Sequence, residues 1–95
     1  MVIPATSTEY LHVAVTAPVG TDLTGTPVRI AVIGHDGNPT SAEWKTAEWV
    51  GTHARLLIGP DSGLVLTRGT YLVWIAVDPP GAEHIVRRSG TLNIT

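Results

Sequence analysis

The nine residues GTYLVWIAV, from Gly69 to Val77, decide the fold class, because they form an unbroken apolar run of strand-favouring residues after Thr70. Val, Ile, Tyr and Trp are enriched in strands, and the run is too short to be an isolated buried helix. Alternate residues of a strand point to opposite faces. The stretch therefore predicts a central strand with two apolar faces, lined by Tyr71, Val73, Ile75 and Val77 on one side and by Leu72, Trp74 and Ala76 on the other.

Other stretches on both sides of this run show the alternation of a half-buried strand. In residues 9–16, Leu11, Val13 and Val15 share one face, and Tyr10, His12 and Ala14 the other. The same pattern predicts a strand at 26–33 with Val28, Ile30 and Val32 inward, and a strand at 53–58 with Ala54, Leu56 and Ile58 inward. Further short strands are expected at 64–66, 84–88 and 91–94.

The segment from Thr40 to Val50 is ambiguous. Ser41 is a residue type that caps a short helical turn. Alternatively, a strand runs from Trp44 to Val50. We predict a loop that ends in a short strand at Glu48–Val50.

Turn residues separate these stretches. Asp-Gly and Pro-containing clusters favour turns because glycine accepts positive φ and proline cannot continue strand pairing. Such clusters occupy 17–20, 35–39, 59–63, 68–69 and 78–81. Ser89 and Gly90 either separate the last two strands or form a bulge within one.

About seven short strands in 95 residues, with no amphipathic helix pattern of ten or more, predict a single all-β domain. The expected architecture is an antiparallel immunoglobulin-like β-sandwich over residues 9–95, preceded by an N-terminal arm over residues 1–8. The cysteine-tryptophan-cysteine signature of antibody domains is absent, because the chain contains no cysteine.

Composition narrows the classes of function. The net charge is −2 with no basic stripe, so we expect no nucleic-acid partner. No run of 18 apolar residues and no signal-peptide pattern is present, so we expect no membrane segment and a product made in the cytoplasm. Charged residues make up only 15%, against about 25% in typical domains. Either a partner covers part of the surface, or the chain is simply a Thr- and Gly-rich β protein.

The chemistry-bearing residues form no recognisable catalytic or metal-binding motif. The four histidines, His12, His35, His53 and His84, lack the short spacing of common zinc sites. Serines, histidines and aspartates are present, but not in a G-x-S-x-G nucleophile elbow. Asp36 and Asn38 suit a calcium loop, but a turn needs the same residues for its backbone. We therefore predict a protein that is not an enzyme, with no catalytic residue, no cofactor and no metal.

Four residues are the predicted contacts with other proteins. Val2 and Ile3 are apolar residues in the arm, which could add to the sheet edge of a neighbour. Trp44 and Trp49 lie in the irregular segment, where we expect one to cover an open end of the sandwich and the other to meet a partner. Trp74 is expected in the core or between the sheets.

Several motifs, taken in order, resemble small immunoglobulin-like structural proteins of tailed phages that infect actinobacteria. These are DLTGTPV at 22–28, Trp44 and Trp49 followed by ARLLIGP at 54–60, RGTYLVWI at 68–75, DPP at 78–80 and GTLNI at 90–94. The chain departs from the pattern at Gly81, where the family is expected to carry glutamate. The resemblance covers roughly residues 8–95.

The resemblance implies a virion structural protein of the head or the head–tail neck, as a capsid decoration or connector subunit. Its partners would be other virion proteins, in many copies, and it implies no catalytic residue. The alternative is a carbohydrate- or receptor-binding module of a tail, baseplate or cell-surface protein, in which Trp44 and Trp49 stack on sugars.

Overall fold

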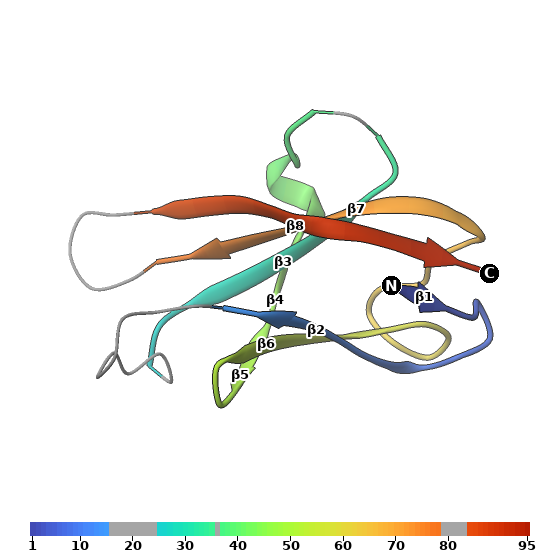
Figure 1. Ribbon diagram of the computed structural model, residues 1–95, viewed down its shortest axis with the longest axis horizontal. Coiled ribbons are helices and arrows are strands. Elements are labelled where there is room, and N and C mark those ends of the chain that lie inside the picture. The colour runs from blue at the N-terminus through green and yellow to red at the C-terminus, as the bar shows by residue number, and fades with distance from the viewer. Residues whose placement is uncertain (16–24, 36, 79–83) are drawn as a thin grey trace.

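Two antiparallel-dominated β-sheets pack face to face in the computed structural model, which describes residues 1–15, 25–35, 37–78 and 84–95 (Figure 1). The first sheet has five strands in the order β1-β8-β7-β3-β4, and the second has three in the order β2-β6-β5. The predicted all-β sandwich is confirmed. The expected turns at 17–20 and around Asp36, and most of that at 78–81, lie outside the described residues.

The five-stranded sheet is built on the long hairpin of β7 and β8. Its strands are β1 (Val2–Ile3), β3 (Val28–Ile33), β4 (Trp44–Thr46), β7 (Gly69–Val77) and β8 (Ile85–Ile94). β7 occupies the residues predicted for the central strand and pairs with β3 on one side and β8 on the other. Its neighbours are antiparallel, whereas β1 runs parallel to the end of β8.

The three-stranded sheet consists of β2 (Glu9–Ala14), β5 (Glu48–Val50) and β6 (His53–Ile58). β6 is its centre, because β2 and β5 pair with opposite edges of β6. The chain passes from β4 in one sheet to β5 in the other at Ala47, as in immunoglobulin-like sandwiches that distribute successive strands between two sheets.

The hydrophobic core lies between the sheets. The alternating residues of each strand that the sequence assigned to one face are the ones that meet there. The buried cluster contains Ile3, Leu11, Val13, Val28, Ile30, Val32, Ala54, Ile58, Leu66, Val73, Ile75, Val77, Leu92 and Ile94.

The outer face of β3 and β7 is also largely covered, as the two apolar faces of residues 69–77 predicted. Ala31, Ile33 and Ala76 are buried there. A short 3-10 helix, η1 (Ser41–Glu43), belongs to the β3–β4 connection and contacts β3. Trp74 lies on this outer face and not between the sheets, because Val73 and Ile75 take the inward positions of β7.

The structure differs from the prediction in three regions. Residues 64–66 are not a strand, although Leu66 is buried, because a turn held by Ser62 fixes this segment. The expected strands at 84–88 and 91–94 are one strand, β8, with a register shift that leaves Ser89 unpaired, so of the two alternatives at Ser89 and Gly90 the structure shows the bulge. The segment at 40–50 holds η1 and β4 as well as the predicted strand at Glu48–Val50.

The N-terminal arm belongs to the chain's own sandwich. β1 pairs with Asn93 and Ile94, and the backbone N–H of Ala5 donates to Thr95 O at 2.8 Å. The expectation that the arm adds to a neighbour's sheet is therefore not what this structure shows, because the end of β8 in the same chain offers the arm a free edge. Among the described residues no helix is long and apolar enough to cross a membrane.

Candidate binding surface

A shallow groove of about 470 Å³ opens where the chain crosses from one sheet to the other. One wall comes from β4 and the crossover residue Ala47, and the other from β6 and the loop that follows it. The lining residues are Tyr10, Lys45, Thr46, Ala47, Glu48, Arg55, Leu56, Leu57, Gly63 and Leu64.

The floor of the groove is a gap in the pairing of β6. β5 is only three residues long, so it pairs with His53, Ala54 and Arg55 and then stops. Further along the same edge, the Gly59 N–H donates to Leu64 O at 2.9 Å. Between these contacts lies Leu57. Because hydrogen bonding alternates along an antiparallel strand, the backbone N–H and C=O of Leu57 point to this side, away from β2.

The rim of the groove carries more positive than negative charge. Arg55 Nε donates to Glu48 Oε1 at 2.6 Å, and its guanidinium stacks on the ring of Tyr10 at 4.0 Å from the centroid. Lys45, on the opposite wall, has no ion pair among the described residues. The three charges Lys45, Arg55 and Glu48 sum to one positive charge, which favours an acidic ligand.

The loop that forms one wall of the groove begins at Gly59, whose backbone conformation only glycine adopts readily. Gly59 adopts φ +108°, and a Cβ at this position would lie 2.0 Å from Ser7 O. Ser62 Oγ donates to the carbonyl oxygen of Gly59 or Leu64, at 2.6 and 2.9 Å. This turn places Gly63 and Leu64 at the groove.

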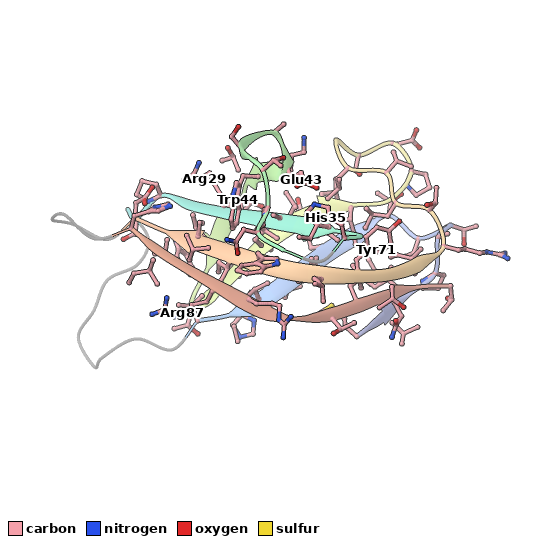
Figure 2. The ribbon with its side chains drawn as sticks, turned by 90° about the horizontal axis from the view of Figure 1, so that it is seen from above. Arg29, His35, Glu43, Trp44, Tyr71 and Arg87 are labelled. Atoms are coloured by element: carbon pink, nitrogen blue, oxygen red, sulfur yellow. The ribbon has the colours of Figure 1, made fainter. Side chains whose placement is uncertain are left out.

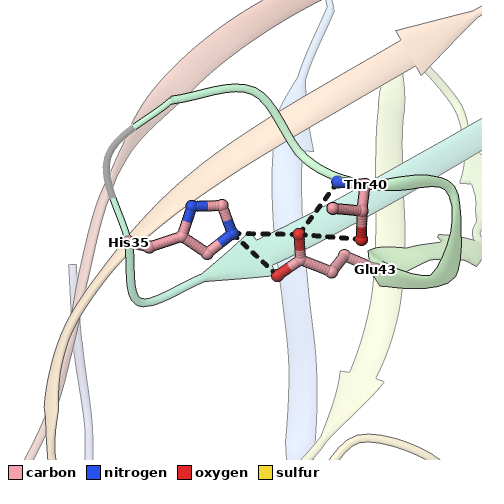
Figure 3. A network of polar contacts seen from close by, with 3 residues as sticks. All are labelled: His35, Thr40 and Glu43. Atoms are coloured by element: carbon pink, nitrogen blue, oxygen red, sulfur yellow. Dashed lines mark hydrogen bonds and ion pairs between the residues drawn. The ribbon is translucent and has the colours of Figure 1, made fainter.

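A polar network organises the β3–β4 connection (Figure 3). The Thr40 backbone N–H donates to Glu43 Oε1 at 2.9 Å, as in a capping box, and His35 Nε2 lies 3.0 Å from both carboxylate oxygens. The Thr40 N–H lowers the pKa of Glu43 most, and the contact with His35 lowers it further. The network closes the loop before β4, so it supports the wall that carries Lys45.

The predicted contact residues have different positions. Val2 is 63% exposed, but Ile3 is 4% exposed and fills the chain's own core, so its side chain cannot meet a partner. This follows from β1 being a strand, in which neighbouring side chains point to opposite faces.

Trp44 and Trp49 lie on different sheets. Trp49 packs against the core and its Nε1 donates to Thr26 O at 2.8 Å, so it is the tryptophan that covers the edge of the sandwich. Trp44 is half-buried on the outer face of the other sheet, where the Arg29 guanidinium lies 6.0 Å from its ring (Figure 2). The structure therefore does not bring the two indoles together.

Sequence reasoning missed Lys45, Arg55 and Leu57 as groove residues. The sequence contained one indication of this gap. The predicted strand at 48–50 is half as long as the one at 53–58, so part of the longer strand has no partner on that side. The crossover at Ala47 could not be found, since it depends on which sheet each strand joins.

Metal-ligating residues do not gather in the part of the chain that the structure describes, where no group of three or more His, Cys, Asp or Glu could hold an ion. His12 and His53 form an edge-to-face pair on the outer face of the three-stranded sheet, with ring centroids 6.1 Å apart. Comparisons with models of known protein families, with curated proteins and with solved structures found no match.

Proposed function

We propose that this chain is a non-enzymatic assembly subunit of a tailed-phage particle, at the head or the head–tail neck. The groove at the sheet crossover carries the proposal, because it combines the unpaired backbone of Leu57 with a charged rim. The order of the motifs between residues 22 and 94 supports the placement in a phage.

The groove suits an extended segment of a neighbouring virion protein. Such a segment gains main-chain hydrogen bonds at a free strand position and specificity from flanking side chains. Leu57 offers the backbone position, and Lys45 and Arg55 favour an acidic side chain on the segment. The groove is short, so we expect this contact to act together with others made by many copies in the particle.

The second candidate is a sugar-binding module with an aromatic platform. It required Trp44 and Trp49 to act together, and their positions on different sheets remove that basis. We therefore prefer the assembly role.

The direct test is peptide mass spectrometry of phage particles purified from lysates of the host that produces this chain. We expect the chain to co-purify in many copies with the major head proteins. Its recovery only from the soluble fraction of the lysate, never with particles, would show that it is not a virion protein.

The groove is tested by charge reversal. Lys45→Glu removes the positive excess, and we expect incorporation into particles to fall at least about tenfold, as for the loss of a complementary contact worth ~1.4 kcal/mol. Arg88→Glu is the matched control, because Arg88 is exposed on β8 and does not line the groove. Equal incorporation of both variants would show that the groove is not the surface that contacts the particle.

A further inference from the structure

β2 has a free edge along its whole length in the part of the chain that the structure describes. It stands at one end of the three-stranded sheet, and its six residues pair only with β6. Such an edge presents a row of backbone donors and acceptors that another strand can satisfy.

The register shows which groups point outward. The Val15 N–H donates to Thr52 O at 3.0 Å, which continues the β2–β6 register by one residue. Hydrogen bonding alternates along an antiparallel pair, so Glu9, Leu11 and Val13 bond to β6. Tyr10, His12 and Ala14 therefore direct their N–H and C=O groups to the free edge.

The other sheet edges carry features that discourage pairing. β4 and β5 are three residues long, and β1 is two. The open part of β8 contains the bulge at Ser89 and the exposed residues Arg88 and Arg87, the second of which is labelled in Figure 2. Short length, bulges and charges are the usual means by which proteins protect an edge. β2 has a regular register with no bulge, no proline and no lysine.

The sequence of β2 suits pairing with itself. Two-fold symmetry places like residues near one another, so a charged strand would repel its own copy, as Arg87 and Arg88 would in β8. Residues 10–14 are Tyr, Leu, His, Val and Ala, none of which is an acid, a lysine or an arginine. An isologous contact requires such a self-complementary surface.

We propose that a second copy of this chain pairs with β2 in antiparallel orientation, with His12 facing His12 of the copy across a two-fold axis. In this register Tyr10 pairs with Ala14 of the copy, so all three outward residues form hydrogen-bonded pairs. The pairing joins the two three-stranded sheets into one continuous sheet. It does not depend on the phage assignment, because it rests on the edge alone.

The test uses the absence of cysteine from the chain. His12→Cys places two thiols in a hydrogen-bonded pair, where the Cα atoms lie about 5.5 Å apart, within the range that a disulfide spans. His53→Cys is the matched control, because His53 is also exposed but lies on β6, one strand away from the edge. Under mild oxidation, we expect His12→Cys to form a covalent dimer at least about tenfold faster than His53→Cys.

Sedimentation equilibrium of the unmodified protein gives the second readout. We expect a mass that rises from 10.0 kDa toward twice that value as the concentration increases. We expect His12→Lys to weaken this association, because it places two positive charges near the axis, while His53→Lys leaves it unchanged. A monomer at millimolar concentration, or cross-linking at equal rates in the two cysteine variants, would overturn the proposal. Either result leaves the particle test to be decided separately.

Discussion

Gly59 shows how one residue holds two parts of the molecule together. Its backbone has φ +108°, a conformation that residues other than glycine rarely adopt. The carbonyl oxygen of Ser7 occupies the space that a Cβ atom would need. The residue follows the last residue of β6, begins the groove loop and lies against the backbone of Ser7 and Thr8, which lead into β2. Both backbone conformation and close approach therefore require glycine.

We expect Gly59→Ala to lower the free energy of unfolding by more than about 2 kcal/mol, because it combines backbone strain with a steric clash. Gly63→Ala is the control, since a Cβ at Gly63 meets nothing within 4 Å. Urea denaturation of both variants measures the difference. Equal midpoints for the two variants would contradict the role given to Gly59.

Glu43 makes the β3–β4 connection sensitive to acid. Its pKa is lowered below the ordinary value of 4.5 by the Thr40 N–H and by His35. A carboxyl group whose pKa is lower in the folded state stabilises the fold above its unfolded-state pKa, and this stability is lost as the pH falls through the folded-state value.

We expect Glu43→Gln to lower the urea midpoint of unfolding at pH 7 more than at a pH well below 4.5, where the wild-type carboxyl is also neutral. Denaturation at the two pH values measures the effect, and NMR titration of the Glu43 carboxyl gives its pKa directly. A difference between variant and wild type that does not change with pH would exclude a charged capping carboxylate.

At the scale of elements, the two-residue strand β1 completes both the sheet edge and the core. β1 covers the end of β8 with backbone hydrogen bonds from Asn93 to Met1 O and from Thr95 to Ile3 O. It also places Ile3 in the core next to Ile58, Leu66 and Ile94. The arm is thus part of the fold of its own chain.

We expect Ile3→Ala to lower the free energy of unfolding by about 2–4 kcal/mol, as for other buried large-to-small changes. Val2→Ala, at the exposed neighbouring position, should stay within about 0.5 kcal/mol of the wild type. Chemical denaturation at two protein concentrations measures both. A loss for Ile3→Ala that disappears at high concentration would indicate that the arm binds another copy.

Period-two alternation located the longer strands well. The bounds of β5, β6 and β7 are those expected, and Leu11, Val13 and Val28 point inward as predicted. Alternation works for β2 because one of its faces is buried and the other is exposed, whereas β7 was located by its unbroken apolar run, since both of its faces are covered. For β8, the serine–glycine pair marked the position of the bulge but did not distinguish it from a break between two strands.

The same pattern could not locate the remaining features. Leu64 and Leu66 alternate like a strand, but their backbone is held by a turn and by no neighbouring strand. β1 is too short to show any period. The faces of Trp44, Trp49 and Trp74 depend on strand pairing, and so does the groove, because it exists only where two sheets and a crossover meet.

At the scale of the whole molecule, a closed core is combined with an outer surface that offers several contact points. Exposed apolar side chains occur on both sheets and in the groove loop, including Val2, Val50 and Val65, the last at 66% exposure. β2 and the unpaired backbone of Leu57 lie on opposite sides of β6, although the side chain of Tyr10 on β2 also lines the groove. One copy could therefore contact another copy and a different protein at the same time, which is what a repeated particle subunit requires.

Cryo-electron microscopy of intact particles from the producing host tests this account most directly. We predict symmetry-related density for the two-sheet sandwich at the head or neck, with an extended segment of a neighbouring protein in the groove between Lys45 and Leu57. A particle map in which every subunit is assigned and none has this fold would contradict the account.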